Sequence, residues 1–213
     1  MASMRDIKRR RGSIQSTQQI TKAMKLVSTV KLQKARGRAE KSKPYFNYMY
    51  DTMMSVLSKA GSVDHPYLKD NGSDKIGVVV VTSNRGLAGG YNSNIVKMIT
   101  GGDFPKEKTR IYAVGSKGRD GLASKGYEIA QDYSDMIEEP VYGDAKMIGE
   151  TLLKDYMSGE IGSIYLVYTF FKNTVSHIPT LMKLLPLDAS DAENVEPASE
   201  ELAIMEFEPN EDC

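Results

Sequence analysis

The sequence predicts an α/β protein with a largely parallel β-sheet and a long N-terminal helix that projects from it. Residues 2–43 contain no proline and are rich in Lys, Arg, Gln, Ala, Leu and Met, which favour helix. After Asp74 the apolar residues instead form short continuous runs, which are typical of strands buried on both faces. These runs alternate with helical segments, and this alternation predicts a parallel sheet covered by helices.

The N-terminal helix is expected to span residues 1–61. Within residues 2–43 only Gly12 and Gly37 disfavour helix, and an apolar face continues past Pro44. A helix of this length would be roughly 80 Å long and would have to project from a globular part of this size. Its apolar residues recur at about helical spacing, with a preference for intervals of seven residues. This pattern predicts a thin coiled-coil seam formed by Ile7, Ile14, Ile20, Met24, Val27 and Val30.

Charge is distributed unevenly although the whole chain is neutral, with 28 basic and 28 acidic residues. Residues 1–43 hold thirteen Lys or Arg against Asp6 and Glu40, whereas residues 188–213 hold ten carboxylates and no Lys or Arg. Like charges three or four residues apart on a helix repel each other, and an acidic partner would offset this repulsion. A solvated helix face is the plain alternative. Another is a nucleic-acid-binding arm, which would rely on phosphate contacts because no aromatic residue precedes Tyr45.

The globular part is expected over residues 74–213, as a Rossmann-like sheet with right-handed crossovers. Its helices are predicted from Asn92 or Ser93, as the cap, to Thr100, from Ser116 to Lys125, and from Asp144 to Met157. The acidic segment before residue 202 reads as an exposed loop. The predicted strands cover residues 76–81, 109–114, 128–131, 163–171, 175–187 and 202–207.

The residue pattern favours no catalytic, cofactor or metal site. The glycine-rich loop at residues 84–91 could cradle a phosphate, but neither it nor the loop at 115–121 has the spacing of a dinucleotide fingerprint or a P-loop. Such glycines usually allow positive φ angles and close packing. His65 and His177 are far apart, and Cys213 is the only cysteine. A nucleotide-dependent enzyme is therefore the weakest of the alternatives.

Four motifs resemble the gamma subunit of F-type ATP synthases. The first is ITKAMKLV at residues 20–27, with RDIK before it and Lys31-Leu32 after it. The second is TSNRGLAGGYNSN at residues 82–94. The others are VGSKGRD at 114–120 and KLLPL at 183–187. They occur in the family's order and spacing over nearly the whole chain.

The resemblance implies a non-catalytic rotor subunit that couples proton flow to ATP synthesis or hydrolysis. Its N-terminal helix would be one strand of an antiparallel coiled coil inside a ring of alpha and beta subunits. The globular domain would contact the epsilon subunit and the c-ring, on the cytoplasmic face of the bacterial cell membrane. The chain would bind no nucleic acid, cofactor or small-molecule substrate. The residues implied to contact the acidic lever loops of beta are Arg9, Arg10, Ile20, Lys22, Met24, Lys25 and Val27, and those of the signature loop are Arg85, Gly86, Leu87, Gly89, Gly90 and Asn92.

The sequence departs from the family pattern at its end. Members of the family continue with a C-terminal helix that pairs with the N-terminal one, whereas this sequence ends at Cys213. The sequence is therefore expected to be a truncated gamma subunit whose seam is exposed. Such a chain should elute larger than a monomer or exchange its amide protons rapidly over residues 2–40.

Overall fold

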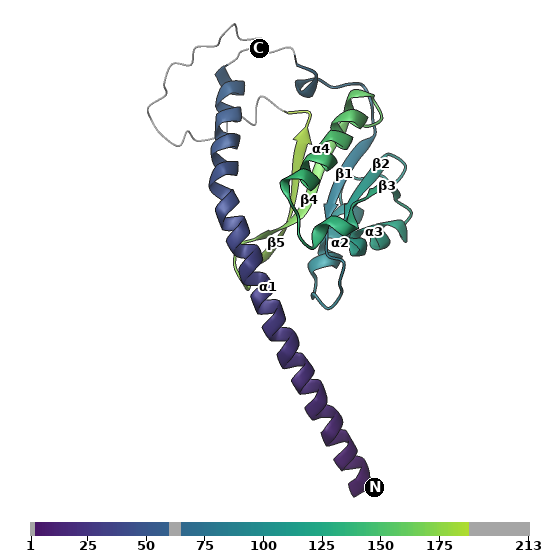
Figure 1. The fold of residues 1–213 in the computed structure, drawn as a ribbon. Helices are drawn as coiled ribbons and strands as arrows, with labels where there is room; N and C mark the ends of the chain where they lie inside the picture. Colours follow the sequence, from purple (N-terminus) through teal and green to yellow (C-terminus); the bar gives the residue numbers. More distant parts are fainter. Residues whose placement is uncertain (1–2, 60–64, 188–213) are drawn as a thin grey trace. The chain divides into compact units, whose positions relative to one another are not determined.

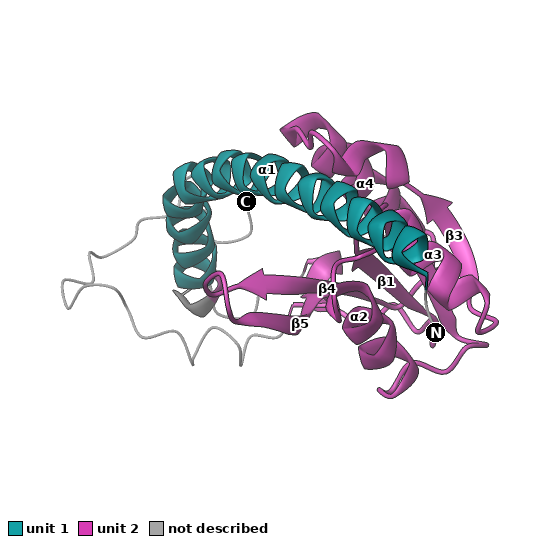
Figure 2. Ribbon diagram, turned by 90° about the horizontal axis from the view of Figure 1, so that it is seen from below, with its two compact units in different colours: residues 1–56, 197–201 teal, residues 57–196, 202–213 magenta. Residues whose placement is uncertain are grey.

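The computed structural model describes residues 3–59 and 65–187, which fall into two compact units. One unit reaches to Val56 and consists of helix; the other begins at Leu57 and contains the sheet (Figure 2). We refer to the second unit as the sheet domain.

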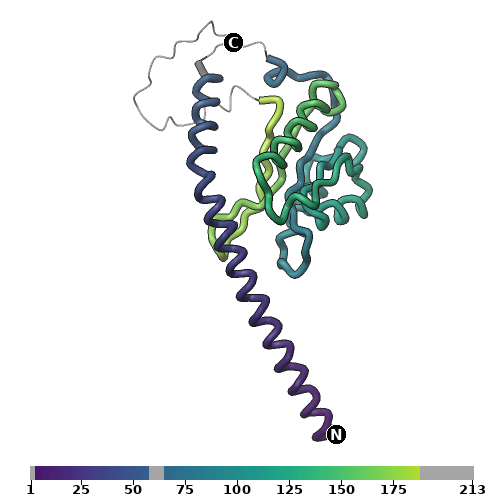
Figure 3. The backbone as a smooth tube through the Cα atoms, in the orientation of Figure 1, coloured from purple at the N-terminus to yellow at the C-terminus, as the bar shows by residue number. Residues whose placement is uncertain are grey.

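Helix α1 runs from Met4 to Lys59, a span of 56 residues. At 1.5 Å per residue it is about 84 Å long. Pro44 lies inside it, and the backbone trace shows one uninterrupted helix (Figure 3). The prediction of a long N-terminal helix that continues past Pro44 is confirmed.

The sheet has five strands in the order β3-β2-β1-β4-β5 (Figure 1). Its strands are β1 (Ile76–Val81), β2 (Thr109–Val114), β3 (Glu128–Asp132), β4 (Ser163–Phe171) and β5 (His177–Leu185). The first four are parallel, and β5 pairs with β4 antiparallel. The largely parallel α/β sheet is therefore confirmed.

Two apolar cores cover the two faces of this sheet, because side chains alternate along each strand. Val78 and Val80 point into a core that contains residues of α2 (Tyr91–Thr100) and α3 (Ser116–Ala123). Val79 points into the other core, with residues of α4 (Tyr142–Met157). Figure 2 shows α4 and α2 on opposite sides of the sheet. The valine run is thus buried on both faces, as the sequence predicted.

Several boundaries differ from the prediction. Helix α2 begins at Tyr91 with Gly90 as its N-cap and no side-chain cap, so the prediction that Asn92 or Ser93 caps it is wrong. Helix α4 begins two residues early, where the Asp144 carboxylate accepts a hydrogen bond from the Val141 amide at 3.0 Å. Two short 3-10 helices, η1 (Pro66–Leu68) and η2 (Ser134–Ile137), were not predicted. The predicted strand at 202–207 and the acidic loop lie outside the described residues.

Candidate partner-binding surfaces

The predicted contact residues on α1 lie on its exposed surface. Ile20, Met24 and Val27 are 58%, 53% and 57% exposed, although all three are apolar. Their spacing of four and three residues places them along one side of the helix. Lys22 lies on the opposite side of the helix and Lys25 also points away from the apolar residues, while Arg9 and Arg10 lie about 15 Å or more nearer the N-terminus. The structure therefore brings the three apolar contact residues into one stripe, with the two lysines on other sides of the helix and the two arginines farther along it.

Few carboxylates neutralise the positive charge of α1. Within residues 4–43 the described ion pairs join Arg9 to Asp6 at 3.7 Å and Arg36 to Glu40 at 2.6 Å. Both pairs are largely exposed, and exposed pairs of this kind stabilise a helix by less than about 1 kcal/mol. Among the described residues, the other Lys and Arg side chains of this stretch have no carboxylate within 4 Å. We refer to the exposed surface of α1 over residues 4–43, with the apolar stripe on one side and these cations around it, as the basic face.

The second surface is the predicted signature loop, whose residues 82–90 follow β1 and whose Asn92 already belongs to α2. Asn92, in the first turn of α2, reaches back into this loop. Its side-chain oxygen accepts from the Ser83 amide at 2.9 Å, and its amide nitrogen donates to the Arg85 carbonyl at 3.3 Å. Asn92 thus fixes the base of the loop instead of capping the helix.

Asn84 ties the same loop to two other elements. Its amide nitrogen donates to the Ser134 carbonyl of η2 at 2.8 Å, and its oxygen accepts from the Ser116 amide at 2.8 Å. These part-buried bonds connect the loop to the start of α3. The sequence pattern did not single out Asn84; the available signal was a polar residue three positions after the end of a buried strand.

The second glycine-rich loop, at residues 115–121, donates hydrogen bonds from its backbone amides to the signature loop. The amides of Ser116, Lys117 and Gly118 donate to Asn84, Ser83 and Thr82, at 2.8, 3.1 and 2.8 Å. Gly115 has a φ of +117°, and a Cβ there would lie 2.3 Å from the Thr82 carbonyl oxygen. These glycines serve backbone conformation and close packing, as predicted, and the α3 amides that could hold a phosphate are already used by protein acceptors.

The tip of the signature loop is exposed. Leu87 is 97% exposed and has a φ of +59°, in the left-handed region that leucine rarely adopts. Gly89 has a φ of +58°, and a Cβ on Gly86 would meet nothing within 4 Å. Arg85 pairs with Glu138 at 3.4 Å, and both side chains are exposed. The loop therefore has a fixed base and presents an apolar side chain to solvent.

The remaining candidates form no metal or membrane site in the described residues. His65 accepts from the Tyr67 amide at 3.2 Å, and His177 stacks on Phe171 with ring centroids 5.7 Å apart. No group of three potential metal ligands is found within residues 3–59 and 65–187. No helix in this part of the chain is long and apolar enough to cross a membrane.

The fold thus defines a protein with a three-layered α/β domain and a long basic helix, and comparison with known proteins supplies its family. The model of the ATP synthase family matches residues 3–213. The chain is 57% identical to the ATP synthase gamma chain of Lachnoclostridium phytofermentans over 98% of its own length and 73% of that chain. It is 34% identical to the sodium-ion-specific ATP synthase gamma chain of Acetobacterium woodii, over 97% and 73% of the two chains. The chain belongs to the ATP synthase gamma chain family, and the resemblance seen in its motifs is confirmed.

Solved structures agree in fold. A chain of the central stalk and c-ring structure of Tetrahymena thermophila mitochondrial ATP synthase matches with a TM-score of 0.59 and 24% identity, over 78% of this chain and 72% of that chain. A chain of the Euglena gracilis mitochondrial ATP synthase rotor matches with a TM-score of 0.56 and 18% identity, over 92% and 70%.

Proposed function

We propose that this chain forms the central shaft of a rotary ATP synthase and carries no catalytic residue itself. The observation that carries the proposal is the 57% identity to a gamma chain over nearly the whole sequence. The basic face of α1 supports it, because a long helix with exposed apolar residues and few acidic neighbours gains stability from a partner with an acidic surface.

The proposed arrangement assigns the two surfaces to different partners. The basic face of α1, from Arg9 to Val27, lies against acidic lever loops of the beta subunits within the ring that alpha and beta form. The sheet domain contacts the epsilon subunit and the c-ring, so that the complex is peripheral to the membrane on its cytoplasmic side. The signature loop, with its fixed base and exposed Leu87, is the contact point that the sheet domain offers to these last two partners.

The coupling ion is a separate part of the proposal. We propose protons, although one relative at 34% identity is named for sodium-ion specificity. Because the chain contacts the c-ring without forming the ion path, its own residues are not expected to select the ion.

Reconstitution tests the proposed function. The chain is mixed with alpha and beta subunits from the same organism and analysed by native mass spectrometry and size exclusion at physiological salt. We expect one copy bound to a ring of three alpha and three beta subunits. Duplex DNA added as a competitor should not displace the ring from the chain. A chain that elutes without the ring, or that DNA displaces from it, would contradict the shaft assignment and favour the nucleic-acid alternative.

A further inference from the structure

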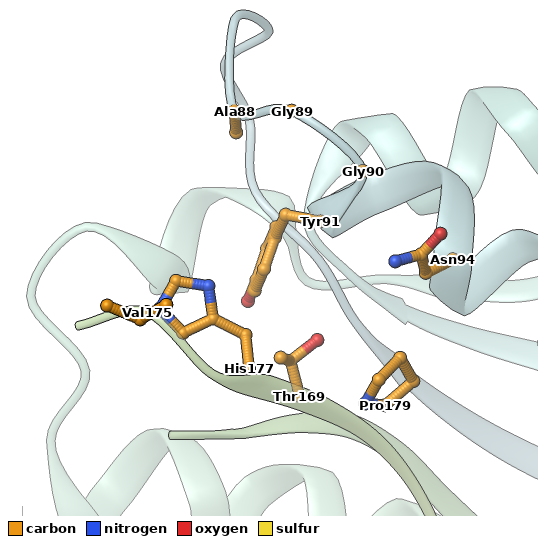
Figure 4. Close-up of a pocket in the computed structure, with 9 residues that line it drawn as sticks. All are labelled: Ala88, Gly89, Gly90, Tyr91, Asn94, Thr169, Val175, His177 and Pro179. Carbon is orange, nitrogen blue, oxygen red and sulfur yellow. The ribbon is translucent and has the colours of Figure 1, made fainter. Parts of the chain in front are cut away.

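A polar pocket of about 270 Å³ lies beneath the signature loop in the sheet domain (Figure 4). Ala88, Gly89 and Gly90 of the loop form one side, Tyr91 and Asn94 of α2 form another, and the start of β5 with Thr169 of β4 forms the third. The pocket lies where the carboxyl ends of the parallel strands β1 and β4 meet. In the sheet, β2 and β3 lie on one side of β1 and β4 lies on the other, so the chain changes direction of sheet growth after β3. Open α/β sheets bind ligands at the crevice where this change occurs.

Polar side chains without partners converge on this pocket. The Thr169 hydroxyl oxygen is buried and has no hydrogen-bond partner. The side-chain amide of Asn94, which is exposed, and the hydroxyl of the half-buried Tyr91 also have no hydrogen-bond partner within the described residues. Figure 4 shows the Tyr91 hydroxyl directed towards His177 and Thr169, and the Asn94 amide nitrogen turned towards the same space. Because a buried polar group is normally hydrogen-bonded, the Thr169 hydroxyl points to an occupant, and the two polar groups beside it face the same space.

Gly90 keeps the space for the Asn94 amide. Its φ of −79° is accessible to any residue, so the backbone does not require glycine there. A Cβ at this position would instead lie 3.0 Å from the amide nitrogen and 3.2 Å from the amide oxygen of Asn94. Asn84 and Asn92 of the same region use their amides within the protein, whereas Asn94 directs its amide into the pocket.

The lining selects the class of ligand. The amide of Asn94 and the hydroxyls of Tyr91 and Thr169 supply hydrogen-bond donors, and no Asp or Glu lines the pocket. Helix α2 begins at the pocket without a side-chain cap, and the N-terminus of a helix carries partial positive charge. Burial raises the pKa of Tyr91, so this hydroxyl keeps its proton and can donate.

We propose that this pocket binds a small oxyanion, of the phosphate or carboxylate type, between the signature loop and the β4–β5 hairpin. The bound anion accepts from Asn94, Tyr91 and Thr169 and connects the loop to the hairpin, which are otherwise separate sides of the pocket. The loop is then held at its base by Asn84 and Asn92 and near its end by the ligand. This inference concerns the chain alone and does not depend on its function as a shaft.

The proposal is tested by titrating the chain with inorganic phosphate at constant ionic strength and recording amide chemical shifts by NMR. We expect saturable shifts at Gly89, Gly90, Thr169 and His177, in the millimolar range, that an equal concentration of chloride does not produce. Acetate tests the carboxylate form of the ligand, and saturation by either anion supports the proposal. Shifts no larger than those in chloride, or saturation by glycerol alone, would overturn it.

Variants locate the site. Asn94→Ala and Thr169→Val should each raise the dissociation constant about three- to tenfold, because each removes one hydrogen-bond donor. Gly90→Ala should do the same by displacing the Asn94 amide, while Thr100→Val at the other end of α2 should bind as the parent does. Unchanged amide shifts of β1 confirm that each variant is folded. Parent-like binding by both Asn94→Ala and Thr169→Val would place the anion elsewhere and refute the proposal.

Discussion

Helix α1 and the sheet domain bury their apolar residues to very different degrees. In the sheet domain Val78, Ile95 and Ile111 are fully buried, and each of the two sheet faces has its own core. On α1 the stripe that includes Ile20 and Met24 remains exposed, and almost every neighbouring charge is positive. The sheet domain can therefore be stabilised by its own packing, whereas α1 depends on whatever covers its basic face.

The largest effect is expected from a glycine in the sheet domain. Gly115→Ala places a Cβ 2.3 Å from the Thr82 carbonyl oxygen at a backbone φ of +117°. Steric overlap and backbone strain together should lower the free energy of unfolding of the sheet domain by about 3 kcal/mol or more. Urea unfolding followed by near-UV circular dichroism measures this. A loss under about 1 kcal/mol would mean that the two loops can separate without cost.

The next effect concerns the base of the signature loop. Asn84→Ala leaves the Ser116 amide and the Ser134 carbonyl without their partner, which should cost about 2 kcal/mol. Asn84→Asp keeps the acceptor for Ser116 and loses only the donor to Ser134, so it should fall between Ala and the parent. Equal unfolding midpoints for the Ala and Asp variants would show that the Ser116 bond contributes nothing.

Charge reversal on α1 should leave the fold intact and weaken partner binding. The double variant Lys22→Glu/Lys25→Glu should bind the alpha–beta ring roughly tenfold more weakly, and the loss should shrink at high salt. The control, Lys106→Glu/Lys125→Glu, makes the same change of charge on the sheet domain. Affinities are measured by biolayer interferometry at two salt concentrations. An equal loss in both double variants would indicate net charge, and not the basic face, as the cause.

A smaller, pH-dependent effect is expected at Asp132. A hydrogen bond from the Ser134 hydroxyl, followed by the Arg119 guanidinium, holds the pKa of Asp132 below its usual 3.8. Because this pKa is lowered in the folded state, the stabilisation is present above the unfolded pKa and is lost as the pH falls through the folded value. Asp132→Asn should therefore flatten the decline of stability between about pH 4 and pH 2. A parent-like acid profile would refute this assignment.

The smallest effect is the counterpart of the first prediction, on α1. A Cβ on Gly12 would meet nothing within 4 Å, and Ala favours helix over Gly by up to about 1 kcal/mol. Gly12→Ala should slow amide exchange in the flanking turns and leave the sheet domain unchanged. Slower exchange in β1 as well would mean that the two units fold as one.

The sequence predicted elements, such as β1, whose side chains are all buried and therefore form one apolar run. It did not predict features that depend on contacts between residues far apart in the sequence. The valines of β1 form a continuous run because both faces of that strand are covered, so its limits were predicted correctly. The cap of α2 was predicted wrongly because Asn92 forms bonds with Ser83 and Arg85, seven to nine residues back, that compete with capping. The role of Asn84 rests on Ser116 and Ser134, which only the folded chain brings close.

The family was evident from four motifs in order, whereas the contacts on α1 remain predictions. Arg9 and Arg10 lie on the same helix as Ile20, but nothing within the chain shows which surface they meet. The seam formed by Ile7, Ile14 and their neighbours has the spacing of a coiled coil, and the described residues include no second helix antiparallel to it within the same unit.

The central claim is that α1 takes its stability from a partner and the sheet domain from its own core. Hydrogen–deuterium exchange on the chain, alone and bound to alpha and beta subunits, tests it most directly. Alone, the amides of residues 4–40 should exchange far faster than those of β1 and β2, and they should become protected on binding. Protection of residues 4–40 equal to that of β1 in the chain alone, as a monomer, would contradict the account.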